Sequence, residues 1–542
     1  MQVTGTYDIA IVGSGFGGSL VAMIARRIGR SVVLIEKGVH PRFAIGESST
    51  PLSNLLLDEL ASRYDLPHLR PFTAWGSWQR SYPHVGCGLK RGFSFYHHSL
   101  GGPAEQVFER NRQLLVAASP NDAISDTHWY RADFDRFFLR EAVEMGVEYF
   151  DQTALSRMTE SQDCITIEGN RLSEPVRLQC RFLVDATGPR GFIHRALRLR
   201  ENALPGFPET QGLYSHFSGV KEFGARQPAG SMDVPPYPVD DAALHHIFDG
   251  GWIWILRFNN GLTSAGAAAT DAVAEKLRFE EGGPVWDRLL ELLPSVREQF
   301  SAANAELPFV HARRLSFLTE CAAERRWAML PSAAAFVDPL LSTGFPLTLF
   351  GVSRLGEIIA NHWESPAFSD QLHNYAAQTR KEAIATAQLV GALYATMRDF
   401  RLFASVSFLY FAAASFAETA RRLRKYHLAS SFLLCDDPVF GPACARLCDQ
   451  ARRARTGAEC AKVSAAILRA IEPFNVAGLG DVERRNWFPA DPADLIRAAA
   501  KVDATPESIL GMLEQHGFRG DAAVTSRRES AALTQIPRRP EA

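Results

Sequence analysis

The stretch Tyr7-Asp-Ile-Ala-Ile-Val-Gly-Ser-Gly-Phe-Gly-Gly18 decides the fold of this chain. An apolar strand leads into a Gly-x-Gly-x-x-Gly turn formed by Gly13, Gly15 and Gly18, and a helix is expected over 19–28. The first glycine allows a tight turn, the second lets a pyrophosphate approach the backbone, and the third lets the helix pack on the strand. The unpaired N–H groups at the start of the helix would then favour the phosphates.

A second buried strand over 31–36 ends in Glu36, whose carboxylate can accept hydrogen bonds from adenosine ribose hydroxyls. Strand, turn, helix, strand and acid follow one another in the order typical of an α/β dinucleotide-binding domain. We therefore assign Phe16, Gly17 and Lys37, which flank the turn and the acid, to the same cofactor-binding set. This motif alone does not separate FAD from NAD.

Later segments favour FAD. Arg131 opens a helical run that resembles the arginine-led segment of flavin hydroxylases, and a buried strand follows over 182–188. Asp338 lies where flavoproteins hold the ribityl chain. The further candidate cofactor contacts are Arg42, Glu47, Ser48, Arg131, Ala186, Gly188, Asp338, Gly344 and Phe345.

Composition and charge narrow the class of protein. The chain has 542 residues, of which 46% are hydrophobic and 22% charged, so it can bury a core and form about three domains. A formal net charge of −2 gives no electrostatic footprint for nucleic acid or an anionic membrane. Eight cysteines without a Cys-x-x-Cys pair predict free thiols in the cytoplasm, with neither a metal site nor a disulfide framework.

Two segments bear on location. The first residues lack the basic start and apolar run of a signal peptide. The charge-free run 402–417 is shorter than the about 20 residues that span a bilayer, which favours a buried helix or the wall of an apolar pocket. An interfacial membrane helix is the alternative. We expect a cytoplasmic protein without a membrane partner.

Three stretches resemble flavin-dependent halogenases. Cys87-Gly-Leu-Lys-Arg-Gly-Phe-Ser-Phe95 contains the Lys-x-Gly-x-x-Phe pattern of the members that act on phenols and pyrroles. Phe336-Val-Asp-Pro-Leu-Leu-Ser-Thr-Gly344 matches their Phe-x-x-Pro-x-x-Ser-x-Gly pattern. Gly251-Trp-Ile-Trp-Ile-Leu256 resembles Trp-x-Trp-x-Ile-Pro, although Leu256-Arg257 replaces Ile-Pro. The likeness is greatest to the phenolic, phloroglucinol-type halogenases of the pyoluteorin pathway.

The resemblance implies a reaction and roles for particular residues. Reduced FAD and O2 give a C4a-hydroperoxide, which oxidises chloride or bromide to hypohalous acid. By this likeness Thr343 and Gly344 bind the halide, and Lys90 captures or orients the hypohalous acid beside the substrate. The candidate walls of the substrate pocket are Phe93, Phe95, Trp252 and Trp254. Core packing is an equal explanation for the two tryptophans and the better one for the two phenylalanines.

Other features concern substrate and partners. Tryptophan halogenases carry a glutamate before Ser-Thr-Gly, whereas this chain has Leu341, which favours a phenol or pyrrole as the small aromatic substrate. No second Gly-x-Gly-x-x-Gly follows a strand, so we expect a separate NAD(P)H-dependent flavin reductase. A carrier protein is compatible with the sequence but not indicated. A flavin-dependent aromatic hydroxylase and a non-catalytic flavin-binding relative remain as alternatives.

These motifs predict interleaved domains of α/β class. A Rossmann-like FAD-binding domain would comprise 1–65, 128–195 and 320–365, as in flavin monooxygenases. A β-sheet substrate domain would comprise 66–127 and 196–319. A helical C-terminal region over 366–524 and a flexible tail over 525–542 would complete the chain.

Overall fold

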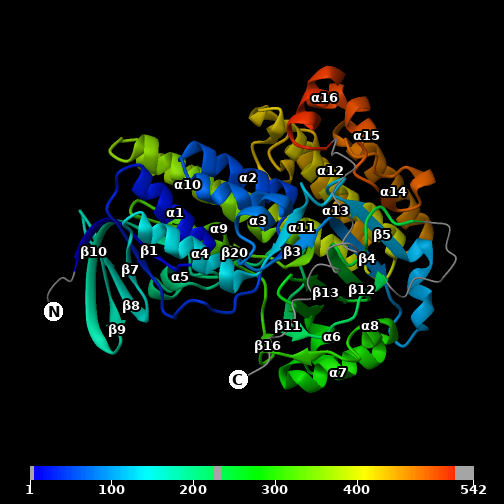
Figure 1. Cartoon of the computed structure of the whole chain (residues 1–542), viewed down its shortest axis with the longest axis horizontal. Coiled ribbons are helices and arrows are strands. Elements are labelled where there is room, and N and C mark those ends of the chain that lie inside the picture. Colours follow the sequence, from blue (N-terminus) through cyan, green and yellow to red (C-terminus); the bar gives the residue numbers. More distant parts are fainter. Residues whose placement is uncertain (1–4, 225–233, 519–542) are drawn as a thin grey trace, which may run out of the picture.

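A computed structural model describes residues 5–224 and 234–518 of the chain. Two β-sheets lie next to each other, with long helices across them and further helices at the C-terminal end (Figure 1). The predicted α/β class, with a Rossmann-like unit, a second sheet and a helical C-terminal region, is confirmed. The predicted tail over 525–542 lies outside the described residues.

The first sheet has eight strands, and its centre is parallel. Strands from three separate parts of the chain form it, which is the interleaving that the motifs predict. Its members are β1 (Gly5–Val12), β2 (Val32–Ile35), β7 (Glu148–Phe150), β8 (Thr153–Glu160), β9 (Ile165–Arg171), β10 (Glu174–Asp185), β18 (Ala323–Glu324) and β19 (Trp327–Met329). Their order is β18-β19-β10-β1-β2-β7, and β9 pairs with both β10 and β8.

Helix α1 (Phe16–Arg27) begins three residues earlier than the sequence predicts. The predicted start is too late because glycines are poor helix formers, and the helix contains Gly17 and Gly18 in its first turn. The packing requires them nevertheless, because a Cβ on Gly18 would stand 1.9 Å from the Gly13 carbonyl oxygen. The helix ends before Gly29, which has a φ of +84°.

The second sheet has nine strands and separates two hydrophobic cores. Alternate residues of a strand point to opposite faces, so Trp252 and Trp254 share one face, as expected. They belong to the core that includes the long C-terminal helices, while Ile253 belongs to the other core. Its strands in order are β15 (Asn304–Ala305), β11 (Thr210–Ser218), β14 (Thr263–Thr270), β13 (Gly251–Arg257), β12 (Ala243–Phe248), β4 (Gly92–His97), β5 (Gln113–Ala117) and β21 (Trp487–Phe488), with β16 (Val310–Ala312) on β11.

Two further sheets have two strands each. Strand β3 (Cys87–Lys90) pairs antiparallel with β6 (Asp126–Trp129), and β17 (Phe317–Leu318) pairs with β20 (Ala335–Phe336). The shorter helices are α2 (Pro51–Arg63), α3 (Trp75–Ser81), α4 (Arg131–Glu144), α5 (Phe192–Ala196), α6 (Asp271–Leu277), α7 (Gly283–Leu292), α8 (Pro294–Gln299) and α9 (Pro331–Ala334).

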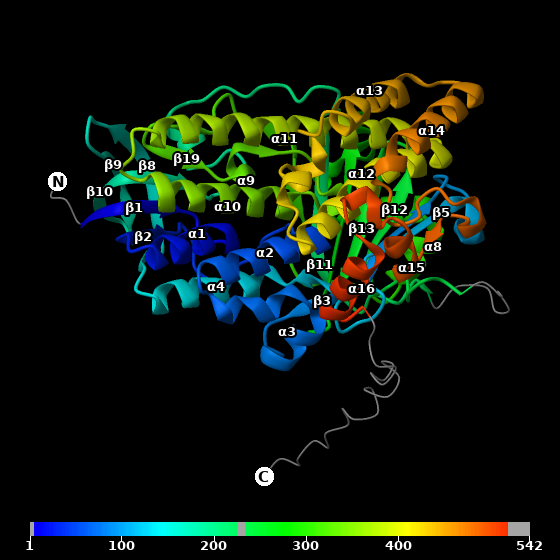
Figure 2. The same ribbon diagram turned by 90° about the horizontal axis from the view of Figure 1, so that it is seen from above.

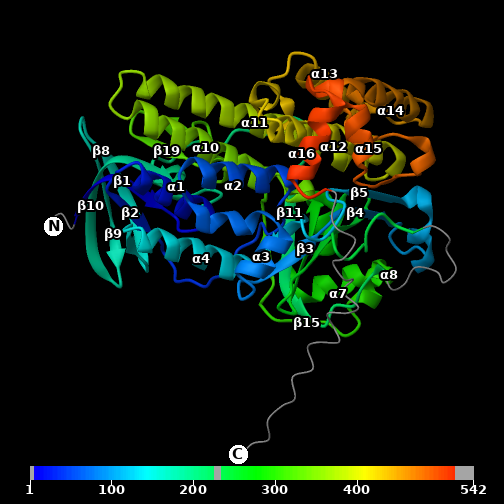
Figure 3. The ribbon, with the colours of Figure 1, turned by 45° about the horizontal axis from the view of Figure 1, so that its top comes forward.

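Long helices dominate the second half of the chain. Helices α10 (Gly344–His362) and α11 (Phe368–Thr396) lie side by side in the view from above (Figure 2). The helices after them gather over the second sheet (Figure 3). They are α12 (Phe400–Arg422), α13 (Phe440–Arg453), α14 (Gly457–Ile471), α15 (Pro492–Arg497) and α16 (Pro506–Gln515). The short strand β21 interrupts this helical region and pairs with β5.

Helix α12 contains the apolar run 402–417. Within the described residues it is the one helix long and apolar enough to cross a membrane, but 83% of its most apolar window is buried inside the protein. It packs against α2, α11 and α14. The prediction of a buried helix here is therefore confirmed.

Candidate functional site

A cavity of about 410 Å³, here called the cofactor cavity, opens at the start of α1. The turn after β1, the segment after β2, the end of β10 and the start of α10 all contribute to its lining. Most of the predicted cofactor contacts therefore come together although they are far apart in sequence. Those that line it are Gly15, Phe16, Gly17, Arg42, Arg131, Ala186, Gly188, Asp338, Gly344 and Phe345.

Of the glycines in the turn, Gly13 is needed for close packing against the protein backbone, whereas Gly15 lines the cofactor cavity. Gly13 has a φ of +101°, and a Cβ there would stand 2.6 Å from the Ala186 carbonyl oxygen. Gly15 instead faces the cavity, where a Cβ would lie 3.4 Å from the Arg42 guanidinium and 3.5 Å from that of Arg131. Bare backbone, a helix start and two guanidinium groups fit the pyrophosphate of a dinucleotide such as FAD.

Buried ion pairs hold the two arginines in place. Arg131 binds both oxygens of Asp135, at 2.7 and 2.8 Å, and donates to the Gly46 carbonyl oxygen at 2.9 Å. Arg42 lies 3.6 Å from Glu36. Burial alone would raise the pKa of Glu36, but Arg42 and the N–H groups of Gly38 and Ser14 outweigh it and lower the pKa. An ionised carboxylate suits the predicted role of accepting ribose hydroxyls.

Besides Gly13 and Gly18 of the turn, four predicted cofactor contacts lie apart from the lining of this cavity. Lys37 is exposed, and Glu36 borders the cavity through Arg42. Glu47 accepts a hydrogen bond from Nε2 of His216 at 2.9 Å and lines a smaller neighbouring pocket together with Ser48.

The turn before α10 is the predicted halide site. Leu341 and Ser342 have φ values of 64° and 55°, a backbone conformation that is uncommon for residues other than glycine and marks a turn held by its surroundings. Thr343 is buried and lines the cofactor cavity. A Cβ on Gly344 would meet no atom within 4 Å, so this backbone is open to the cavity. The positive end of the α10 dipole favours an anion at this position.

The smaller pocket, of about 90 Å³, contains the tryptophan pair and is here called the tryptophan pocket. It shares Asp338, Gly344 and Phe345 with the cofactor cavity. The rings of Trp252 and Trp254 lie 5.5 Å apart. The two indoles therefore face the predicted halide turn across a small, largely apolar space.

Asp338 is held in a buried hydrogen-bond chain at this junction. Its oxygens accept from the Leu340 N–H at 3.0 Å and from the Tyr394 hydroxyl at 2.9 Å. Tyr394 in turn accepts from the indole N–H of Trp252 at 3.0 Å. Burial raises the pKa of Asp338 to about 7 despite these hydrogen bonds. The chain links a cofactor-cavity residue to the wall of the tryptophan pocket.

Lys90 ends β3 and has no solvent exposure. Its Nζ donates to Ser48 Oγ at 2.8 Å and to the Ser49 carbonyl oxygen at 2.6 Å, and lies 3.9 Å from the centre of the Phe93 ring. Ser48 lines the tryptophan pocket. Phe93 lines another pocket, on the side of helix α12. The amine therefore contacts one lining residue of each of two pockets, although Lys90 itself lines neither.

The β3–β6 ladder places Asp126 opposite Lys90. Burial lowers the pKa of Lys90, and the charge of Asp126 opposes that shift. Burial raises the pKa of Asp126, which accepts a hydrogen bond from Asn54 at 2.9 Å. The nearby His245 is buried beside Lys90, which lowers its pKa to about 3, so it is uncharged at neutral pH. Lys90 and Asp126 therefore form the electrostatic pair of this region.

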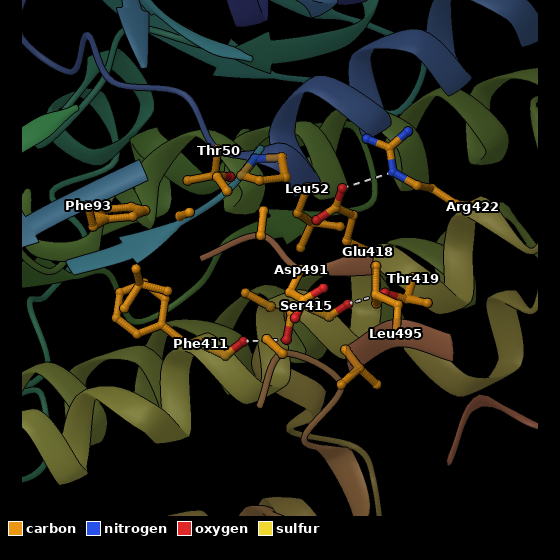
Figure 4. A pocket seen from close by; sticks show the side chains of 18 of the residues that line it. Thr50, Leu52, Phe93, Phe411, Ser415, Glu418, Thr419, Arg422, Asp491 and Leu495 are labelled. Carbon is orange, nitrogen blue, oxygen red and sulfur yellow. Dashed lines mark hydrogen bonds and ion pairs between the residues drawn. The ribbon is translucent and has the colours of Figure 1, made fainter. Parts of the chain in front are cut away.

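The cavity beyond Phe93, here called the α12 pocket, has a volume of about 110 Å³ and mostly apolar walls (Figure 4). Strands β4 and β5, the start of α2, helix α12 and C-terminal segments enclose it. Phe95, also predicted as a pocket wall, is instead buried in the core, with its ring 4.6 Å from that of His245.

Two residues of this region escaped the sequence analysis. Asp126 is a neighbour of Lys90 only through strand pairing, which no local motif encodes. Glu418 lines the α12 pocket and is the first charge after the apolar run of α12. Glu418 could have been found from the sequence, because a charged residue that directly follows an apolar helical run and falls on the buried face of the helix is unusual.

Comparison with known proteins identifies the family. The chain belongs to the tryptophan halogenase family, whose sequence model matches residues 104–403. The protein is therefore a flavin-dependent halogenase, an oxidoreductase that uses FAD, O2 and a halide, and the predicted resemblance is confirmed.

Individual relatives are distant. The chain is 28% identical over 403 residues to monodechloroaminopyrrolnitrin halogenase PrnC of Pseudomonas fluorescens, spanning 73% of this chain and 69% of that protein. It is 26% identical to tetracycline 7-halogenase of Kitasatospora aureofaciens, spanning 63% of this chain and 61% of that protein. The crystal structure of halogenase PltM with phloroglucinol and FAD has 23% identity and a TM-score of 0.77, over 89% of this chain and 99% of that one, which supports the fold.

Proposed function

We propose that this protein halogenates an electron-rich, phenol-type aromatic molecule, using hypohalous acid that passes Lys90. The observation that carries the proposal is that the Lys90 amine contacts both Ser48, which lines the tryptophan pocket, and Phe93, which lines the α12 pocket. When bound, reduced FAD reacts with O2 and supplies the oxidising power that converts a halide into hypohalous acid. The residues of the chain bind, orient and separate the reactants.

At the cofactor end, Gly15, Arg42 and Arg131 would hold the pyrophosphate. The N–H groups of Thr343 and Gly344 would hold the halide at the start of α10 without adding a competing nucleophile. The indoles in the tryptophan pocket would keep the aromatic substrate away from the flavin and so disfavour direct hydroxylation.

Between the cavities, Lys90 would donate a hydrogen bond to the hypohalous acid or form a haloamine with it. Complete burial makes this amine less basic than an exposed lysine, and so more readily a nucleophile at neutral pH. Asp126 would act as a positioning residue, because its charge sets how readily Lys90 holds its proton.

The substrate class follows from the absence of a glutamate at Leu341 and from the single-ring size of the α12 pocket. We further propose that a separate NAD(P)H-dependent reductase supplies reduced FAD by diffusion in the cytoplasm. Steady turnover by the purified protein with NADPH alone would contradict this.

The test is mass spectrometry of products from phenols, indoles and pyrroles supplied with reduced FAD, O2 and bromide or chloride. We expect halogenated phenols. Hydroxylated products that do not vary with halide would indicate a flavin hydroxylase. Flavin oxidation without any product would favour a non-catalytic flavin-binding protein.

A further inference from the structure

The α12 pocket carries charge at one end. Phe411, Ser415, Glu418 and Arg422 follow one another at spacings of three or four residues on α12 and therefore share one face of the helix. Figure 4 shows Phe411 and Phe93 at one end of the pocket and Glu418 towards the other, with Arg422 beyond it. Arg422 Nε donates to one carboxylate oxygen of Glu418 at 2.8 Å. The Glu418 side chain is 15% exposed.

The second carboxylate oxygen of Glu418 has no hydrogen-bond partner among residues 5–224 and 234–518. The other polar groups of the pocket are already engaged. Ser415 Oγ donates to the Phe411 carbonyl oxygen at 2.7 Å, and Asp491 accepts from the Ala493 N–H at 2.9 Å. A carboxylate oxygen facing an apolar pocket is stabilised by a hydrogen-bond donor, so the pocket suits a ligand that brings one.

The size and walls of the pocket limit that ligand to one aromatic ring. A protein cavity of about 150 Å³ with apolar walls binds benzene, and the α12 pocket has about 110 Å³. The rings of Phe93 and Phe411 meet edge to face, with their centres 5.5 Å apart. An aromatic ligand would extend this arrangement, since offset and edge-to-face contacts favour further rings.

We propose that Glu418 is a specificity-determining residue, which accepts a hydrogen bond from the hydroxyl group of a single-ring phenol bound in the α12 pocket. The inference deepens the proposed function, on which it rests, by assigning the group that recognises the substrate. The ring then lies against Phe93, whose face contacts the Lys90 amine.

This contact also favours the reaction. Electrophilic attack on a phenol ring places positive charge on the phenolic oxygen, and a carboxylate beside its hydrogen stabilises that charge more than it stabilises the resting phenol. Glu418 would therefore increase kcat as well as strengthen binding. Arg422 keeps the carboxylate in its orientation through the 2.8 Å bond.

The experiment compares phenol with anisole, its methyl ether, in the full-length protein supplied with FADH2, O2 and bromide. For Glu418→Gln we expect kcat/KM for phenol to fall about 10- to 100-fold, with kcat contributing, and kcat/KM for anisole to stay within about twofold. For each substrate, kcat/KM of the variant is divided by kcat/KM of the wild type, so the effect of the larger methyl ether on binding is the same in both and cancels. An unchanged ratio of phenol to anisole would overturn the assignment.

Glu59→Gln is the matched control. Glu59 of α2 pairs with Arg421, the neighbour of Arg422 on α12, and its side chain is 14% exposed, but it does not line the α12 pocket. It should leave the ratio of phenol to anisole unchanged. Thermal unfolding and FAD binding of both variants should match the wild type, because glutamine keeps the acceptor for the arginine.

Calorimetric binding of phenol and anisole to the FAD-loaded protein separates this inference from the proposed function. If the wild type brominates neither compound, the proposed function fails. Weaker binding of phenol but not of anisole to Glu418→Gln would then still support the recognition role. Equal binding of phenol to wild type and variant would overturn it.

Discussion

Replacing Lys90 with alanine tests the central step of the proposed reaction. The substitution removes an amine that donates to Ser48 and to the Ser49 carbonyl and lies 3.9 Å from the Phe93 ring. Leaving a buried acceptor without a donor costs about 1–3 kcal/mol, and loss of a buried amine offsets part of that cost. We expect the free energy of unfolding to fall by about 2 kcal/mol, so the variant should fold.

Lys90→Ala should prevent halogenation of the substrate without changing FAD binding or the release of hypohalous acid. Lys90 does not line the cofactor cavity, so Lys90→Ala should bind FAD as the wild type does, which flavin fluorescence measures. A β-diketone trap should detect the same release of hypohalous acid. Halogenated phenol, measured by mass spectrometry, should fall by about 10²–10⁴-fold, the range for loss of a catalytic proton donor or nucleophile.

Lys462→Ala, on the exposed surface of α14, is the matched control and should retain full activity. Lys90→Met keeps the length of the side chain and should behave as Lys90→Ala does. Halogenation within tenfold of the wild type in either Lys90 variant would refute the assigned role. Loss of hypohalous acid release together with product would place the defect in the cofactor cavity instead.

Three further substitutions test the surroundings. Asp126→Asn removes the charge that opposes the fall in the pKa of Lys90, so the limb of the pH–rate profile due to Lys90 should move to lower pH; an unmoved limb would argue against the pairing. Gly15→Ala places a methyl 3.4 Å from Arg42, so FAD titration should show affinity at least about tenfold weaker, whereas Gly457→Ala, with open space around it, should have no effect. Burial raises the pKa of Asp338 to about 7 in the folded protein, above its value of about 3.9 in the unfolded chain. Protonated Asp338 therefore contributes fully to the free energy of unfolding below about pH 3.9, and this contribution is lost as the pH rises through 7. Denaturant unfolding of the FAD-free protein should show that decline in the wild type but not in Asp338→Asn.

The sequence predicts the cofactor end of the site better than the substrate end, for a physical reason. Gly18 packs on the Gly13 carbonyl within one turn, and the strand before this turn pairs with the strand over 32–35, so the spacing of the motif reflects a local geometry. The halide turn over 336–344 is likewise contiguous. Motifs of this kind can be recognised because the backbone itself forms the binding surface.

The substrate end depends on contacts between distant segments. Asp126 reaches Lys90 by strand pairing, and Glu418 faces Phe93 across a pocket enclosed by several elements. Phe95, two residues after Phe93, points to the same face of the sheet but is covered by His245 and Phe403. Periodicity assigns a residue to a face, but only the packed tertiary structure separates a pocket wall from the core.

The order of strands in the first sheet has a consequence for synthesis of the protein. Strand β1 lies beside β10, β10 lies beside β19, and α11 contributes Thr379 and Ala383 to the lining, so the cofactor cavity is complete only when the segments from Gly5 to α11 are present together. Domains fold as units while the ribosome adds residues from the N-terminus. The nascent chain therefore lacks a finished flavin site until more than half of it has been made, and strand β10 waits for its late partner β19. A chain that stalls before residue 344 would expose this sheet to aggregation and quality control, so we expect slow maturation and a benefit from excess flavin during expression.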